Sequence, residues 1–280
     1  MARKLLASTA TAALLLAIAA PAGAQGRELR YELHLDAPIT ASAIGLVVGS
    51  ELLKADLVPD HCRWCDRDGD RDALDFLDRG ARNAFRWEDR KLAAQTSDVL
   101  GFIASPILSF GGLTIAAAED HAEKRTPVDV LIVVECVAMS AVLNQIVKFV
   151  VARERPYAHE RSVSGWLEPP KKPDDNLSFW SGHTSLTFTL AAACGTVAAL
   201  RGYDLAPLVM GVSGSLALAT GYLRIAADKH YFTDVLTGAV MGSAMGILLP
   251  IVFHGRTSET STPQTTAPLT TQAFSFGSSF

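Results

Sequence analysis

Two groups of polar residues stand at the ends of apolar stretches with spacing suited to binding an anion. Lys148 and Arg155 are seven residues apart, which puts both cations on almost the same face of a helix, and Pro156 marks the end of that helix. The Ser-Gly-His segment at 181–183 opens a later apolar stretch. Its serine suits the N-cap position, and the first backbone N–H groups of such a helix are free to hold an anion.

A third group, Arg224, His230 and Asp234, leads into the last apolar stretch. His230 and Asp234 are one helical turn apart, a spacing that lets the carboxylate hold the imidazole. Transfer of a phosphoryl group needs a nucleophile in line with the leaving oxygen, positive groups around the other oxygens and a proton for the departing alcohol. The three groups together supply each of these requirements.

Five apolar stretches must position these groups, and each is about the length that crosses a bilayer as a helix. They cover residues 99–118, 130–147, 184–200, 205–223 and 235–253. The second and fourth stretches end, and the third and fifth begin, on one side of the molecule. The three polar groups can therefore converge there. We predict an all-α, membrane-associated helical bundle with about five spanning helices.

The packing of the last stretch supports this prediction without excluding a soluble bundle. Gly238, Gly242 and Gly246 recur at every fourth position, a pattern that lets two helices approach closely in lipid. All five stretches are also rich in Ala, Gly and Ser, as a soluble bundle with a very apolar core would be. Hydropathy alone leaves both alternatives open.

The three groups resemble the three-part signature of the type 2 phosphatidic acid phosphatase and vanadium haloperoxidase superfamily. That signature is Lys, six residues, Arg-Pro; then Pro-Ser-Gly-His; then Ser-Arg, five residues, His, three residues, Asp. The matching positions are Lys148, Arg155, Pro156, Ser181, Gly182, His183, Arg224, His230 and Asp234. Trp180 stands where the family usually has Pro and Leu223 where it usually has Ser, and neither change removes a group that performs the chemistry. The resemblance covers residues 95–254.

The resemblance implies a role for each matching residue. His230 is the nucleophile that forms a phosphohistidine, with Asp234 fixing one ring nitrogen, and His183 protonates the leaving group and later activates water. The phosphoryl oxygens are bound by Lys148, Arg155, Arg224, the Ser181 hydroxyl and the Gly182 N–H. No metal or other cofactor is expected, because three cations already neutralise the charge.

The function expected on this basis is metal-independent hydrolysis of a lipid phosphate or lipid pyrophosphate, because the site meets a phosphate at headgroup depth. The expected partners are a phosphorylated lipid and the membrane. A formal charge of −4 with 49% hydrophobic residues excludes a disordered chain and a basic nucleic-acid binder. A secreted soluble acid phosphatase, a vanadium-dependent haloperoxidase and a non-catalytic lipid-phosphate-binding protein are the alternatives left open.

The two ends of the chain have compositions unlike the bundle. Residues 1–24 combine a positive start, an apolar stretch and a small-residue cleavage site, which predicts a signal peptide or an uncleaved anchor of the same orientation. A signal peptide and an uncleaved anchor both place residue 25 outside the cytoplasm. Residues 255–280 are rich in Ser and Thr and predict a low-complexity tail. Alternatively, the alternating apolar residues at 31–35 and 274–276 pair as edge strands.

Residues 25–94 are predicted to be an extracytoplasmic region with a short strand and an amphipathic helix at about 72–87. Cys62 and Cys65 lie in this region, where a local disulfide is favoured over reduced thiols.

The stretch at 41–57 decides the orientation of the site. It is interrupted by Glu51 and Lys54, so it is expected to be a buried or interfacial helix rather than a span. Five spans then place the active site on the periplasmic or exterior face of the inner (cytoplasmic) membrane. A sixth span would place it in the cytoplasm.

Overall fold

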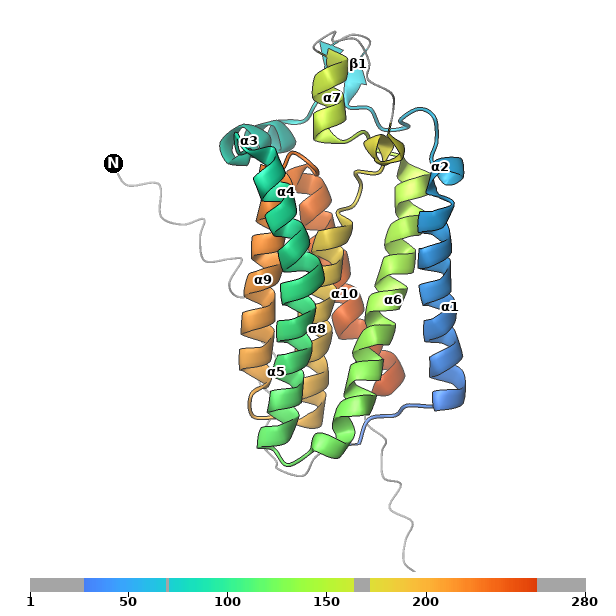
Figure 1. Ribbon diagram of the computed structural model, residues 1–280, viewed down its shortest axis with the longest axis vertical. Coiled ribbons are helices and arrows are strands. Elements are labelled where there is room, and N and C mark those ends of the chain that lie inside the picture. Colours follow the sequence, from blue (N-terminus) through green and yellow to red (C-terminus); the bar gives the residue numbers. More distant parts are fainter. Residues whose placement is uncertain (1–27, 69–70, 164–171, 256–280) are drawn as a thin grey trace, which may run out of the picture.

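A computed structural model describes residues 28–68, 71–163 and 172–255, which form a bundle of long helices with a polar cap at one end (Figure 1). The long helices are α1 (Leu33–Leu52), α4 (Arg90–Val99) continued through the π-helix η2 (Leu100–Ala104) into α5 (Ser105–Glu119), α6 (Thr126–Val151), α8 (Gly182–Arg201), α9 (Ala206–Ala226) and α10 (Phe232–His254). The short elements are α2 (Lys54–Leu57), β1 (Arg67–Asp68), β2 (Arg71–Asp72), α3 (Phe76–Phe85), η3 (Glu123–Arg125), α7 (Pro156–Val163) and η4 (Pro173–Asn176).

The helical membrane bundle predicted from the sequence is confirmed, with one correction to the number of spans. Within the described residues, six helices are long and apolar enough to cross a membrane, and five of them contain the predicted stretches. The sixth is α1, which the sequence analysis wrongly took to be too short. The helix begins at Leu33 rather than at 41, so Glu51 falls in its last turn and Lys54 lies beyond it, in α2.

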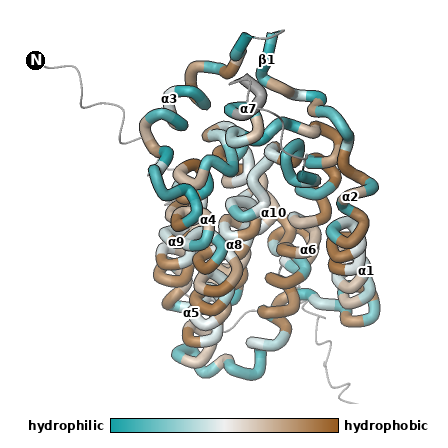
Figure 2. The backbone as a smooth tube through the Cα atoms, turned by 45° about the horizontal axis from the view of Figure 1, so that its top comes forward, coloured by the Kyte–Doolittle hydropathy of each residue, from teal (hydrophilic) through white to brown (hydrophobic). Residues whose placement is uncertain are grey.

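Figure 2 shows apolar positions along the helices and hydrophilic positions at both ends. In Figure 1, α2, α3, α7 and the β1–β2 hairpin lie together at one end of the bundle and form the polar cap. Helices α1, α6 and α9 begin at the opposite end of the bundle, and α10 ends there. The start of α1 at Leu33 and the end of α10 at His254 therefore both lie far from this polar cap. The ends of α6 and α9 and the starts of α8 and α10 meet beneath the cap, as the order of the apolar stretches predicted.

The region before residue 94 differs in part from the prediction. Arg67 pairs with Asp72, and Asp68 with Arg71, in a two-residue antiparallel hairpin. The amphipathic helix is shorter than 72–87, because β2 takes up Asp72 and the Asp75 side chain caps α3 by accepting from the N–H groups of residues 77 and 78. The 31–35 segment is already helical from Leu33, while 274–276, the signal region and nearly all of the tail lie outside the described residues.

Helix α8 is the central helix, and its contact with α10 is made backbone to backbone. Most of α8 is buried, and its N-cap is Ser181, whose hydroxyl accepts a hydrogen bond from the Thr184 N–H. A Cβ added at Gly238 would lie 2.8 Å from the Ser181 carbonyl oxygen, and one at Gly246 would lie 2.7 Å from that of Thr189. A Cβ at Gly242 would overlap the Ser185 carbonyl. The glycine pattern therefore sets the distance between the helices that carry the second and third motif groups.

Gly242→Ala should lower the thermal stability of the detergent-solubilised protein, because neither helix backbone can move aside without breaking other contacts. The matched control is Gly211→Ala in α9, where an added Cβ meets nothing within 4 Å. There the substitution should be neutral or stabilising by up to about 1 kcal/mol. Equal melting temperatures for the two variants would contradict the backbone contact between α8 and α10.

Candidate active site

A cavity of about 680 Å³ lies between α1, α4, α6, α8 and α9, and most of the residues predicted to act on a phosphate line it. Those that line it are Lys148, Arg155, Gly182, His183, Arg224 and His230. Ser181 and Asp234 do not. The Ser181 hydroxyl is fully buried and accepts a hydrogen bond from the Thr184 hydroxyl at 2.9 Å, so it caps the helix instead of facing the cavity.

The cations around the cavity are held by few acceptors. Arg224 Nη1 donates to the Ser97 hydroxyl at 3.0 Å and to the Asp98 carboxylate at 3.2 Å. Its Nε is buried and has no hydrogen-bond partner among the described residues. Arg155 donates from Nε to the Asp174 carbonyl at 2.8 Å, which leaves its charge unneutralised by that contact. A buried donor without an acceptor is costly, so this arrangement favours an anion in the cavity.

Gly182 lets a cation approach the backbone at the start of α8. A Cβ at this position would lie 3.1 Å from Lys148 Nζ and 3.0 Å from the Asn144 side-chain oxygen. The Lys148 amine therefore lies beside the start of α8, and a cation next to a helix N-terminus is an arrangement suited to binding phosphoryl oxygens.

His230 is oriented by a partner that the sequence did not reveal. Its Nδ1 lies 2.8 Å from the Ser178 carbonyl oxygen and 3.8 Å from Asp234 Oδ2, so the carbonyl is the direct hydrogen-bond partner and Asp234 is not. A carbonyl oxygen only accepts, which places the proton on Nδ1 and the lone pair on Nε2. Asp234 Oδ2 accepts instead from the Ser178 hydroxyl at 2.5 Å and from the Tyr231 N–H at 3.0 Å.

The environment keeps the His230 imidazole neutral. Burial, followed by the positive charges of Arg155, Arg224 and Lys148, holds the pKa of His230 well below its ordinary value of 6.5. A neutral imidazole with a fixed tautomer has a lone pair available for attack on phosphorus.

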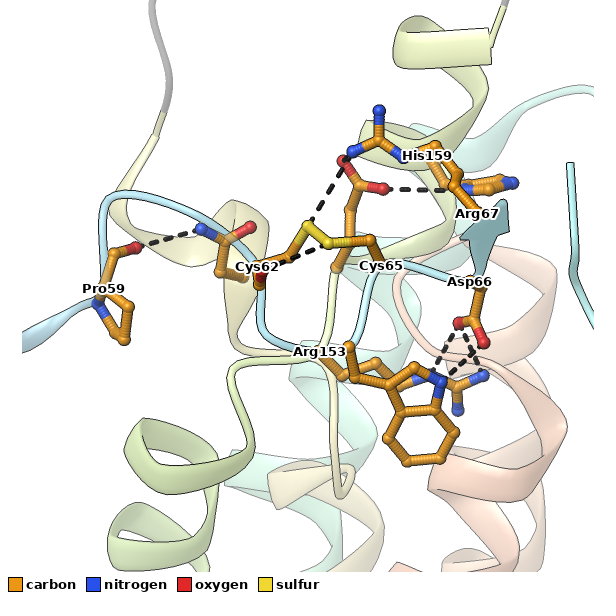
Figure 3. Close-up of a disulfide and its surroundings, with 10 residues drawn as sticks. Pro59, Cys62, Cys65, Asp66, Arg67, Arg153 and His159 are labelled. Carbon is orange, nitrogen blue, oxygen red and sulfur yellow. Dashed lines mark hydrogen bonds and ion pairs between the residues drawn. A yellow bond between two sulfur atoms is a disulfide. The ribbon is translucent and has the colours of Figure 1, made fainter. Parts of the chain in front are cut away.

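Arg153, which the sequence analysis did not single out, anchors this assembly to the polar cap. It is fully buried and donates from Nη1 to Asp234 at 2.8 Å and from Nη2 to Asp78 at 2.7 Å. Its Nε donates to Asp66 at 3.0 Å, as Figure 3 shows. The sequence signal was present: Arg153 stands between the two motif cations, and several aspartates follow Cys65.

A disulfide joins Cys62 to Cys65 directly before Asp66 (Figure 3). The loop that it closes is tied to the chain after α6 by two backbone hydrogen bonds, from the Arg63 N–H to the Ala152 carbonyl and from the Glu154 N–H to the Trp64 carbonyl, both 3.0 Å. The disulfide loop therefore holds Asp66 against Arg153.

These features define a helical membrane protein with a cationic cavity, at the polar ends of its helices, that suits a phosphoryl group. Residues 129–258 match the family model of the PAP2 superfamily, and this segment contains all three motif groups. The resemblance inferred from the sequence is thereby confirmed for residues 129–258.

The chain is also similar to two curated relatives and to one solved structure. The chain is 27% identical over 135 residues to "Phospholipid phosphatase 2" of Rattus norvegicus and of Mus musculus, which is 40% of this chain and 48% of each relative. It thus spans about half the length of these relatives. A transmembrane PAP2-type phosphatidylglycerolphosphate phosphatase from Bacillus subtilis superimposes with a TM-score of 0.42 and 16% identity, over 74% of this chain and 93% of that one.

Because the pKa of His230 is lowered, its imidazole should stay neutral as the pH falls through 6.5 and take up a proton only at a lower pH. The measurement is an NMR titration of ¹⁵N-histidine-labelled protein in micelles, with His230→Asn used to assign the resonance. The tautomer should be the one with Nδ1 protonated. Titration of His230 at or above pH 6.5 would contradict the buried, cation-flanked environment.

Proposed function

We propose that the protein is a metal-independent phosphatase that hydrolyses a lipid phosphate or lipid pyrophosphate ester through a phosphohistidine at His230. The observation that carries the proposal is the cavity itself. The three motif cations, two histidines and the start of α8 surround one space, and the buried Arg224 Nε in it has no acceptor among the residues that the structure describes.

The proposed reaction has two steps, and each uses groups that line the cavity. His230 Nε2 attacks phosphorus, the bond from phosphorus to the alcohol oxygen breaks, and that oxygen keeps the electron pair and takes a proton from His183. In the second step His183 takes a proton from water, and the water oxygen attacks phosphorus. The phosphorus–nitrogen bond breaks with its electron pair returning to Nε2, and inorganic phosphate leaves. Lys148, Arg155 and Arg224 stabilise the charge on the phosphoryl oxygens in both steps.

The shape of the cavity supports a lipid substrate. Its lining follows α6 from Lys148 through Asn144 and Ala141 to Val137, a stripe of roughly 16 Å along a helix that is apolar enough to span a membrane. Val47 and Leu186 add apolar surface from α1 and α8. A phosphate group would bind at the Lys148 end of this stripe, and an acyl or prenyl chain would extend past Asn144 and Ser140 toward the apolar end at Val137. The printed name of the curated relatives, phospholipid phosphatase, agrees with this proposal.

We also propose that the site faces the exterior of the inner membrane. The number of spans no longer supports this orientation. With six spans instead of five, Leu33 and the site lie on opposite sides of the bilayer. The disulfide now supports the proposal. It lies in the polar cap beside the site, and disulfides persist in oxidising compartments rather than in the cytoplasm. In this orientation α1 begins on the cytoplasmic side, which conflicts with the prediction that residue 25 lies outside the cytoplasm.

Purified protein in EDTA should release phosphate from dioctanoyl phosphatidic acid or farnesyl pyrophosphate, and His230→Ala should abolish release, because the nucleophile is gone. Acid quenching with ³²P-labelled substrate should trap a phosphoenzyme in the wild type that the variant lacks. Activity restored only by added metal, or full activity of His230→Ala, would contradict the mechanism. Halide oxidation that requires vanadate, or lipid-phosphate binding without turnover, would support the alternative functions.

In sealed spheroplasts, a membrane-impermeant reductant followed by an impermeant maleimide should label Cys62 and Cys65. The control is a Cys62→Ser, Cys65→Ser variant, which should stay unlabelled because the remaining cysteines, Cys136 and Cys194, are buried. Labelling that appears only after the membrane is permeabilised would place the site in the cytoplasm.

A further inference from the structure

Asp98 contacts two of the motif residues although it lies outside both the motif and the family match, which begins at residue 129. It stands in the last turn of α4 and lines the cavity. Its Oδ1 lies 2.8 Å from His183 Nε2 and 3.2 Å from Arg224 Nη1. The preceding residue, Ser97, is fully buried and accepts a hydrogen bond from the same Arg224 nitrogen.

The turn that follows Asp98 also packs on His183. The Phe102 ring meets the His183 ring edge-on, with centroids 4.5 Å apart, and a Cβ added at Gly101 would lie 3.2 Å from His183 Cδ2. Gly101 and Phe102 belong to η2, a π-helical turn within an otherwise α-helical segment. Such turns occur often at functional sites. One helix segment thus fixes the position of the His183 ring through a carboxylate, a glycine and an aromatic ring.

We propose that Asp98 is a positioning residue that prepares His183 to protonate the leaving alcohol, an inference that rests on the phosphatase function proposed above. An ionised carboxylate only accepts hydrogen bonds, so Nε2 of His183 carries a proton directed at Asp98. The other nitrogen, Nδ1, is then the one that exchanges a proton with the substrate. Asp98 fixes both the tautomer and the orientation of the ring.

The charge of Asp98 matters in the first step. His183 must enter it as a protonated imidazolium, although Lys148, Arg155 and Arg224 line the same cavity. The Asp98 carboxylate touches the ring and offsets the repulsion from these cations. When the bond between phosphorus and the alcohol oxygen breaks, that oxygen takes the electron pair and the Nδ1 proton. His183 then remains as a neutral imidazole that still donates from Nε2 to Asp98.

A comparison of substrates with different leaving groups distinguishes the positioning role of Asp98 from a merely structural one. An alkoxide is strongly basic and must be protonated as it leaves, whereas a nitrophenolate leaves without a proton. Loss of Asp98 should therefore impair hydrolysis of an alkyl phosphate far more than that of an aryl phosphate. A general loss of structure would impair both equally.

The experiment compares kcat/KM of the wild type and Asp98→Asn for dioctanoyl phosphatidic acid and for p-nitrophenyl phosphate. This ratio reports the steps up to departure of the alcohol, so slow hydrolysis of the phosphoenzyme does not obscure it. We expect a fall of about 100-fold for the lipid and of roughly threefold or less for the aryl ester. Asp98→Glu, which keeps the carboxylate, should recover part of the lipid activity.

Two further variants test whether Asp98 acts through His183. In a His183→Gln background, Asp98→Asn should cause little additional loss on the lipid substrate, because the residue that it positions is already gone. Asp89→Asn is the matched control: Asp89 caps the start of the same helix, does not line the cavity, and should leave both activities unchanged.

Equal losses on the two substrates, no loss on either, or additive losses in the double variant would each overturn the role of Asp98. If the wild type hydrolyses neither substrate, the proposed function fails and this inference fails with it. If the wild type is active and only the leaving-group dependence is missing, the phosphatase proposal stands and the positioning role does not.

Discussion

The buried charge of Arg153 is the constraint on which the rest of the site depends. A guanidinium that is removed from water must be surrounded by acceptors, and removing one of its partners leaves an uncompensated charge. Here the acceptors come from three separate parts of the chain: Asp66 after the disulfide loop, Asp78 in α3 and Asp234 in α10. One cation thus ties the polar cap to α10, the helix that follows His230. Asp234 uses its other oxygen to hold the Ser178 hydroxyl, and the Ser178 carbonyl orients His230.

The cavity shows the opposite arrangement, because its cations are crowded and incompletely paired. Burial, and then the charges of Arg155 and Arg224, lower the pKa of Lys229, which lines the same space. Such repulsion favours an anionic ligand, and the phosphate dianion of the proposed substrate would supply both negative charge and hydrogen-bond acceptors. The Arg153 side chain has an acceptor at each of its nitrogens, whereas Arg224 Nε has no partner among the described residues. The Arg153 assembly thus holds the polar cap and α10 in place beside a cavity that is left short of negative charge.

The parts that could be predicted from the sequence are those that a local pattern determines. Long apolar stretches gave five of the six helices, and the spacing of the motif residues was sufficient to place six of the eight predicted groups around one cavity. The contact between Asp98 and His183 joins residues 85 apart in the chain, and no local pattern reveals it. Asp234 has the spacing to reach His230, yet the buried Arg153 and the Ser178 hydroxyl attract its carboxylate more strongly. The helix at 41–57 was predicted, but not as a span, because the polar residues His34 and Asp36 and the following Pro38 hide the start of α1.

Both the matched and the unmatched parts of the chain contribute to the cavity wall. The groups suited to the phosphoryl oxygens lie within residues 129–258, the segment shared with the superfamily. The rest of the wall comes from both parts of the chain. The residues before 129 include Val47 and Glu51 in α1, Lys54 in α2, Asp98 in α4 and Phe102 in η2, and the matched segment adds a larger number from α6, α8 and the loops beside them. Lys54 bridges Glu51 at 2.7 Å and Asp174 at 2.9 Å, so it links α1 to the loop that leads to α8. In the function proposed above, the phosphoryl group is common to all substrates, so selection among them must act on the alcohol. Side chains available for that come both from α6 and α8, inside the family match, and from α1 and η2, which the match leaves uncovered.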